Sequence, residues 1–110
     1  MEKLQSYVQE NLADPRISLK WLAENYLFMN VDYVSREFVR QTGEKFSAFL
    51  NRTRMERAKE LLRENREEKI YNVAQQVGCG NNPQYFGQLF KKYTNMTPSE
   101  YVKGLPNDPE

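Results

Sequence analysis

The stretch SLKWLAENYLFMNVDYVSREFVRQTG, residues 18–43, decides the fold of this chain. In its first part apolar residues recur at the three- and four-residue spacing of one helix face. Its second part repeats that spacing after Asn30 and stops at Gly43. Asparagine is a favoured helix N-cap and glycine a favoured C-terminal stop, so the stretch predicts two helices joined by a tight turn. That is the outline of a helix-turn-helix.

A second copy of this pattern occupies residues 69–95, KIYNVAQQVGCGNNPQYFGQLFKKYTN. The apolar residues of the first helix recur at an offset of 51, and those of the second helix at an offset of 52. The second copy therefore carries one extra residue between Val77 and Asn82. Internal repetition is the signature of a duplicated structural unit. The sequence thus predicts two helix-turn-helix lobes in one chain.

The remaining segments also follow helical periodicity, and no stretch alternates as a strand would. Helices are predicted over about residues 2–13, 19–25, 31–42, 46–64, 70–77, 83–94 and 98–102. The predicted fold is all-α, with about seven helices and two helix-turn-helix lobes joined by a long central helix. The expected divisions are a first lobe (1–45), a linker helix (46–64), a second lobe (65–103) and a flexible tail (104–110).

Composition argues against several classes of protein. The chain has no histidine, and Cys79 is its single cysteine, so a metal site, an internal disulfide or a histidine-based triad is not expected. No run approaches the ~18 apolar residues that a membrane-spanning helix needs. A lone cysteine fits a reducing compartment, which predicts a cytoplasmic protein. We expect no cofactor, no catalytic residue and no enzymatic activity.

Charge is unevenly distributed along the chain, although the net charge is only +1. Residues 36–63 carry eight basic and four acidic groups, whereas the segments on either side are net acidic. A local basic strip can neutralise phosphates even when the whole chain is nearly neutral. The candidate phosphate-binding residues are Arg40, Lys45, Arg52, Arg54, Lys91 and Lys92. For each of them, a solvated surface charge or an intramolecular ion pair is the alternative.

Base reading in a helix-turn-helix belongs to the second helix, which enters the major groove with the side that faces away from the core. In the first copy Val34 and Phe38 define the core side, so Arg36 points outward. Its guanidinium fork suits the O6/N7 edge of guanine. The candidate base-reading residues are Asp32, Ser35 and Arg36 in the first copy and Gln84 and Gln88 in the second. Asp32 has the alternative role of favouring the helix N-terminus electrostatically.

The outward face of the second copy offers less for base reading. Gly87 lies on that face and has no side chain, and a glycine inside a helix costs about 1 kcal/mol relative to alanine. Tyr85, Phe86 and Phe90 share a helical spacing and are expected in the core rather than as a stacking platform for single strands. We therefore expect the first lobe to be the main reader.

A combined pattern of high specificity runs through six segments: ISLKWLA (17–23), YVSREF (33–38), RMERAKELL (54–62), IYNVAQQVG (70–78), YFGQLFKKY (85–93) and TPSEY (97–101). It resembles the DNA-binding domain of the AraC/XylS family and is especially similar to the YesN-type response-regulator branch. The resemblance covers about residues 3–103. It implies two recognition helices that address successive major-groove segments. The family's groove-facing positions fall on Asp32, Ser35, Arg36, Gln84, Gly87 and Gln88.

The function that this resemblance implies is sequence-specific binding of double-stranded DNA by a domain of a bacterial transcription regulator. Family members usually carry a separate signal-sensing domain, a receiver or a ligand-binding fold, which we expect to be missing from this chain. The main alternative is a helical interaction module that contacts a protein such as RNA polymerase and binds DNA weakly. An enzyme is the weakest of the three, because no nucleophile, carboxylate pair or metal set is evident.

Overall fold

The computed structural model describes residues 1–105, which form helices and no strand. The elements are α1 (Glu2–Glu10), α2 (Leu19–Leu22), the π-helical turn η1 (Ala23–Leu27), α3 (Val31–Thr42), α4 (Phe46–Glu64), α5 (Ile70–Gln76), α6 (Pro83–Thr94) and α7 (Pro98–Lys103). The all-α fold expected from the sequence is confirmed. Most of the flexible tail expected over residues 104–110 lies outside the described residues, from Pro106 onward.

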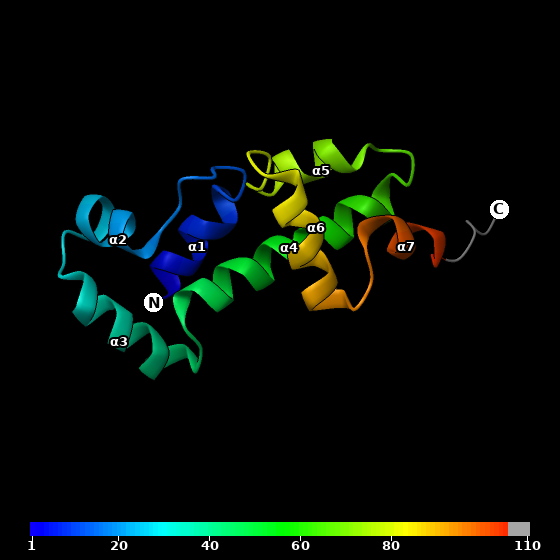
Figure 1. Cartoon of the computed structure of the whole chain (residues 1–110). Coiled ribbons are helices and arrows are strands. Elements are labelled where there is room, and N and C mark those ends of the chain that lie inside the picture. Colours follow the sequence, from blue (N-terminus) through cyan, green and yellow to red (C-terminus); the bar gives the residue numbers. More distant parts are fainter. Residues whose placement is uncertain (106–110) are drawn as a thin grey trace.

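The long helix α4 crosses the middle of an elongated molecule and joins two lobes (Figure 1). α1, α2, η1 and α3 gather at its first half, and α5, α6 and α7 gather at its second half. The described chain measures 50 × 26 × 25 Å along its principal axes. Because 19 helical residues span roughly 28 Å, α4 sets the distance between the lobes.

Each lobe has its own hydrophobic core. The first core includes Phe38 of α3 and Phe49 of α4, with buried residues from α1 and α2. The second core includes Met55 of α4 together with Phe86 and Phe90 of α6. Since α4 supplies residues to both cores, its burial in each lobe keeps the helix continuous between them.

The ends of the two recognition helices follow the sequence signals. The side chain of Asn30 accepts hydrogen bonds from two backbone N–H groups in the first turn of α3, and Asn82 accepts one in α6. Gly43 and Asn95 end these helices in the left-handed conformation, at φ 83° and 65°. Thr97 opens α7 with a complete capping box. These caps fix where each recognition helix begins and ends.

Two helices end earlier than the sequence predicts. α1 stops at Glu10, because Asn11 leaves helical geometry and its side-chain amide donates to the carbonyl oxygen of Tyr7. α5 stops at Gln76, because the chain turns through Gly78 at φ 82°. Neither change moves a recognition helix.

The turn of the first lobe differs from the prediction that its helix ends near Asn25. The helix continues as η1 to Leu27, and Phe28 then takes the left-handed conformation at φ 54°.

The offset between the two copies changes along the turn. Gly78, the left-handed residue of the second lobe, comes 50 positions after Phe28. The apolar residues before these two positions repeat at an offset of 51, and the capping asparagines after them repeat at an offset of 52. The first copy thus has one more residue in its helix, which a wider π-helical turn takes up. The second copy has two more residues in its turn, and the one extra residue inferred from the sequence is the net result.

Candidate nucleic-acid interface

α3 presents one side to the first core and the opposite side to solvent. Val34 and Phe38 are completely buried on the core side. Asp32, Ser35 and Arg36 are all exposed. Positions three and four apart share a helix face, so the structure brings these three predicted base-reading residues together on one surface.

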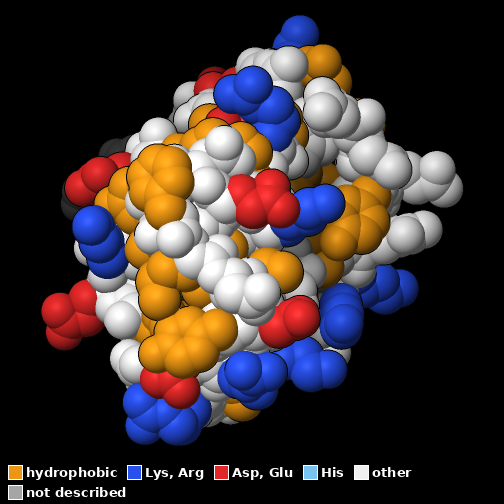
Figure 2. Space-filling view, turned by 90° about the vertical axis from the view of Figure 1, so that its left-hand side faces the viewer, with side chains coloured by type: hydrophobic (Ala, Val, Ile, Leu, Met, Phe, Trp, Pro, Cys, Tyr) orange, Lys and Arg blue, Asp and Glu red, His pale blue; other side chains and the backbone are white. Residues whose placement is uncertain are grey.

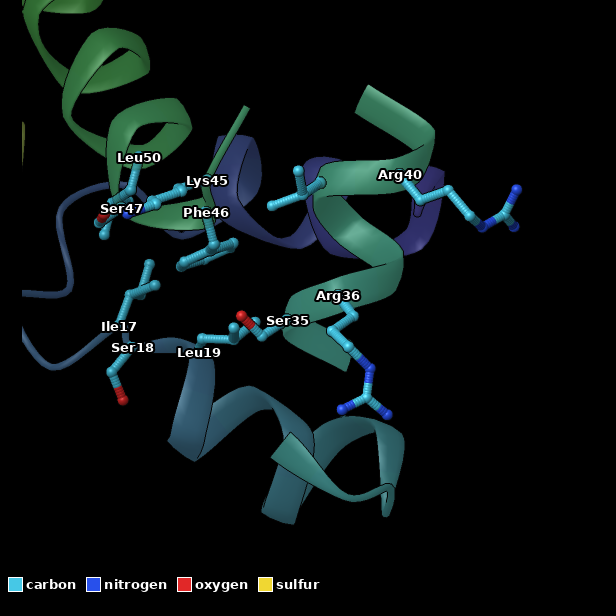
Figure 3. A pocket seen from close by; sticks show the side chains of 11 residues that line it. Ile17, Ser18, Leu19, Ser35, Arg36, Arg40, Lys45, Phe46, Ser47 and Leu50 are labelled. Atoms are coloured by element: carbon cyan, nitrogen blue, oxygen red, sulfur yellow. The ribbon is translucent and has the colours of Figure 1, made fainter. Parts of the chain in front are cut away.

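A groove of about 820 Å³ lies between α3 and the first turns of α2 and α4 (Figure 3). Ser35 and Arg36 line it from α3, and Lys45 lines it just before α4. Its apolar lining comes from Ile17, Leu19, Val39, Phe46 and Leu50. The N-termini of α2 and α4 both lie at this groove, and the partial positive charge of a helix N-terminus favours an anion such as phosphate. On this end of the molecule, basic and hydrophobic side chains are interspersed at the surface (Figure 2).

Arg36 and Arg40 lie one turn apart on α3, but they differ in their partners. Nη2 of Arg40 lies 2.7 Å from Oε1 of Glu37, and the hydrogen bonds from Arg40 lower the pKa of Glu37 to about 2, with help from Gln41. Within residues 1–105, Arg36 forms no hydrogen bond or ion pair of its own, and its guanidinium group points away from that of Arg40 (Figure 3). Arg36 is therefore available to a base edge, whereas Arg40 must first exchange Glu37 for a phosphate.

Replacing Glu37 by glutamine is expected to strengthen DNA binding. The carboxylate of Glu37 is charged at neutral pH and accepts hydrogen bonds from Arg40, which lower its pKa to about 2, so it competes with phosphate for Arg40. The variant releases Arg40 for one more phosphate contact, which steepens the slope of log affinity against log salt by about 0.9. A salt titration of DNA binding measures this slope. Glu60→Gln, which removes the nearer of the two carboxylate partners of Arg57 on α4, is the control and leaves the slope unchanged. An equal slope for both variants contradicts the competition.

Two further predicted phosphate contacts, besides Arg40, are engaged within the chain. Arg52 bridges Glu44 and Glu56, with N–O distances of 2.5 and 3.3 Å, and the hydrogen bond to Glu44 raises the pKa of Arg52. Arg54 is only 7% exposed, and its Nη2 donates to the carbonyl oxygen of Asp14 at 2.9 Å. The prediction that Arg54 contacts phosphate is therefore wrong, because its side chain is buried between the lobes. Arg52 can reach a phosphate only by giving up its carboxylate partners.

α6 also presents one side to a core and the other to solvent, but its outward side carries fewer side chains that could contact DNA. Phe86 and Phe90 are completely buried, whereas Gln84 and Gln88 are exposed. At Gly87 an added Cβ would meet nothing within 4 Å, so this position faces open space and adds no side chain to the face. The two predicted glutamine readers are thus accessible and are neighbours on one face of α6, but Gly87 adds no side chain beside them.

The basic residues of the second lobe lie at the end of α6. Lys91 and Lys92 are both exposed in its last turn. Nζ of Lys92 lies 6.0 Å from the ring centre of Tyr93, a contact weak enough for the ammonium group to remain available to a phosphate.

A pair of tyrosines on the recognition helices was not among the predicted site residues. Tyr85 is 45% exposed, so its predicted place in the core is wrong; Leu89, at 6% exposure, fills that side of α6 instead. Tyr33, its counterpart in the first copy, is also 45% exposed. The sequence repeat pairs these two residues, and that pairing is the signal that could have identified them as surface residues.

Cys79, the single cysteine, is buried in the second core. Burial raises the pKa of its thiol, so the sulfur stays protonated at neutral pH. Residues 1–105 contain no group of three or more histidine, cysteine, aspartate or glutamate side chains placed to hold a metal ion. No helix in this range is long and apolar enough to cross a membrane.

Comparison with known sequences identifies relatives of this architecture. The family model described as "Helix-turn-helix domain" matches residues 24–104. The transcriptional regulatory protein YesN of Bacillus subtilis (strain 168) is 42% identical over 101 residues, which cover 92% of this chain. The same alignment covers 27% of YesN, so the chain spans about a quarter of that relative's length.

Solved structures agree over both lobes. The C-terminal domain of AraT, a response regulator from Geobacillus stearothermophilus, matches with a TM-score of 0.90 and 28% identity, over 99% of this chain and 89% of that one. The C-terminal domain of the two-component response regulator yesN from Fusobacterium nucleatum matches with a TM-score of 0.83 and 37% identity. That alignment covers 92% of this chain and 95% of the other.

Proposed function

Because this chain belongs to the AraC/XylS family of helix-turn-helix domains, we propose that α3 and α6 read adjacent major-groove segments of one DNA duplex. The chain is a DNA-binding domain of a bacterial transcription regulator. Its relatives are transcription regulators rather than enzymes, which favours DNA binding over a helical module that only contacts proteins. We therefore interpret the exposed side chains of α3 and α6 as contacts to DNA.

One observation carries the proposal for base reading: Arg36 is exposed on the outward face of α3, where it lines the groove and forms no hydrogen bond or ion pair within residues 1–105. Its fork would pair with guanine, and Asp32 and Ser35 would contact neighbouring bases on the same face. Gln84 and Gln88 would make the smaller contribution of α6. The first lobe is accordingly the main reader in this proposal.

Phosphate contacts would hold both recognition helices in register without specifying sequence. In the first lobe this role falls to Lys45 and, once released from Glu37, to Arg40. In the second lobe it falls to Lys91 and Lys92. The hydroxyl groups of the exposed tyrosines on α3 and α6 are further donors suited to phosphate oxygens.

The organisation that we propose has residues 1–45 as the first lobe, 46–64 as the linker helix and 65–103 as the second lobe. The chain matches 27% of YesN, so signal sensing in a protein of that length would belong to the remainder. RNA polymerase is the protein partner that a transcription regulator of this type would meet, and the cytoplasm is where bacterial DNA would be bound.

Selection of bound sequences from a random DNA pool, followed by a salt titration on the winning sequence, tests the function. The three proposed phosphate contacts that need no exchange with Glu37, those of Lys45, Lys91 and Lys92, predict a slope of about −2.7, so that affinity falls about 40-fold for a fourfold rise in salt. We expect two half-sites about 10 bp apart, the first more sharply defined than the second. Failure to enrich any sequence, together with no detectable binding at ~50 mM salt, would refute the proposal.

A further inference from the structure

Arg54 lies where the two lobes meet. It sits on α4 between the residues that enter the first core and those that enter the second, and only 7% of it is exposed. Its Nη2 reaches across the lobe boundary to the carbonyl oxygen of Asp14, 2.9 Å away and 40 residues earlier in the chain. The carboxylate of Asp14 is held by Arg16 instead, so Arg54 is bound by a neutral carbonyl. Burial correspondingly lowers the pKa of Arg54.

Gly78 brings the second lobe to the same point. A Cβ added at Gly78 would lie 2.6 Å from the carbonyl oxygen of Leu12 and 2.7 Å from Nη2 of Arg54. Real Cβ atoms essentially never approach so closely, and the Leu12 oxygen belongs to backbone that cannot swing aside. The turn before α6 therefore touches the loop after α1 directly, with Arg54 between them. Figure 1 shows these two segments side by side above α4.

The contact between Gly78 and the loop after α1 connects the lobes directly, in addition to their connection through α4. Among the described helices, every extensive contact between the lobes includes α4. A small surface cavity of about 210 Å³ continues the boundary, lined by Ala13 and Pro15 on one side and by Tyr71 and Gly80 on the other. The loop after α1 and the turn before α6 thus lie against each other over several residues.

We propose that Arg54 and Gly78 form an interlobe joint that fixes the orientation of the second lobe relative to the first, and with it the spacing at which α3 and α6 meet DNA. A single helix allows bending and twisting between the bodies at its ends, and a second contact away from its axis removes that freedom. Arg54 and Gly78 are positioning residues in this role, since neither faces the DNA-reading surface. The consequence for DNA rests on the proposed function, whereas the joint itself does not.

The two glycines with positive φ provide a matched pair of variants. Gly78 has φ 82° and no room for a Cβ, while Gly43 has φ 83° and nothing within 4 Å. Asparagine tolerates this backbone conformation better than other residues with a side chain. Gly78→Asn therefore forces the joint apart, and Gly43→Asn carries the same backbone change without that contact. Arg54→Met removes the hydrogen bond to Asp14 but keeps an unbranched side chain, and Arg57→Met on the exposed side of α4 is its control.

Residual dipolar couplings of the whole 110-residue chain, recorded without DNA, measure the orientation directly. We expect one alignment tensor to fit both lobes in the unmodified chain and in the two controls. In Gly78→Asn and Arg54→Met we expect the lobes to require different tensors while each keeps its own fold. A single unchanged tensor in both variants would overturn the joint. So would loss of folding in both variants with folded controls, because the contact would then serve stability rather than orientation.

A DNA series with the spacing between half-sites varied one base pair at a time gives the second readout. The affinity of the unmodified chain should peak at one spacing. In Gly78→Asn, the ratio of the affinity at the best spacing to that at the other spacings should fall at least fivefold. The affinity of this variant for an isolated first half-site should stay within twofold of that of the unmodified chain. An optimum as sharp as that of the unmodified chain contradicts the role in spacing. If the unmodified chain binds no DNA, the proposed function fails, but the dipolar couplings still decide the joint.

Discussion

Replacing Arg36 by alanine is expected to weaken DNA binding by about 1–3 kcal/mol, which is a loss of about 5- to 150-fold in affinity. Arg36 is the exposed arginine of α3 that forms no hydrogen bond or ion pair within the described chain, whereas Arg40 is paired with Glu37. Its removal costs a bidentate pair with guanine but breaks no contact of the fold. The loss should therefore concentrate at one position of the selected site, where the preference among the four bases becomes flat. Competition binding with single-base variants of the site measures both effects.

The same experiment tests whether the first lobe contributes more to base reading than the second. Gln88→Ala removes an exposed reader of α6 whose neighbour Gly87 offers no side chain to the same face, so it should cost less than Arg36→Ala. Arg57→Ala is the control for loss of an exposed arginine away from α3, and it should leave base preference unchanged. A larger loss for Gln88→Ala than for Arg36→Ala would reverse the assignment of the main reader.

Replacing Phe38 by alanine is expected to destabilise the first lobe by about 3–5 kcal/mol. Phe38 is completely buried, and its ring centre lies 5.5 Å from that of Phe46 and 5.6 Å from that of Phe49. The cavity left behind opens at the centre of the core that holds α3 in place. A domain has only about 5–15 kcal/mol of stability in total, so base reading by α3 should be severely impaired at 25 °C.

The position of the single tryptophan allows the lobes to be followed separately. Trp21 belongs to α2, and its ring centre lies 6.0 Å from that of Tyr7, so its fluorescence reports unfolding of the first lobe. Circular dichroism reports the loss of helix in both lobes. Phe38→Ala should lower the denaturant midpoint of the fluorescence transition, while Phe86→Ala should move it much less. Val39→Ala, at an exposed position of α3, should change the midpoint little. Equal fluorescence shifts for the two phenylalanine variants would mean that the lobes unfold as one unit.

Much of the fold was predictable because its signals are local. Asn30 and Asn82 cap helices whose first turns follow them directly, and Gly43 and Asn95 end those helices where a left-handed residue is needed. These choices depend on neighbours within four positions, which the sequence displays. The outward placement of Arg36 follows from the same local geometry.

The features that escaped prediction depend on residues that are distant in the chain or on subtle backbone differences. Arg54 lies among other arginines of α4 and resembles a surface charge, until the loop at Asp14, 40 residues away, covers it. The π-helical turn at Ala23–Leu27 keeps the apolar pattern of an α-helix, so periodicity alone does not reveal it. The pair between Arg40 and Glu37 is a different case, since their three-residue spacing on α3 is a visible signal for an ion pair.

With both lobes on DNA as we propose, the division of the chain into two cores on one helix makes it a bivalent ligand. Once the first lobe has docked, the second is held near its own half-site at an effective concentration in the millimolar range or above. A second lobe with a dissociation constant of only ~1 mM would then be bound about half the time or more, with no need for strong contacts of its own. The sparse outward face of α6, where Gly87 has no side chain, is compatible with useful avidity for this reason.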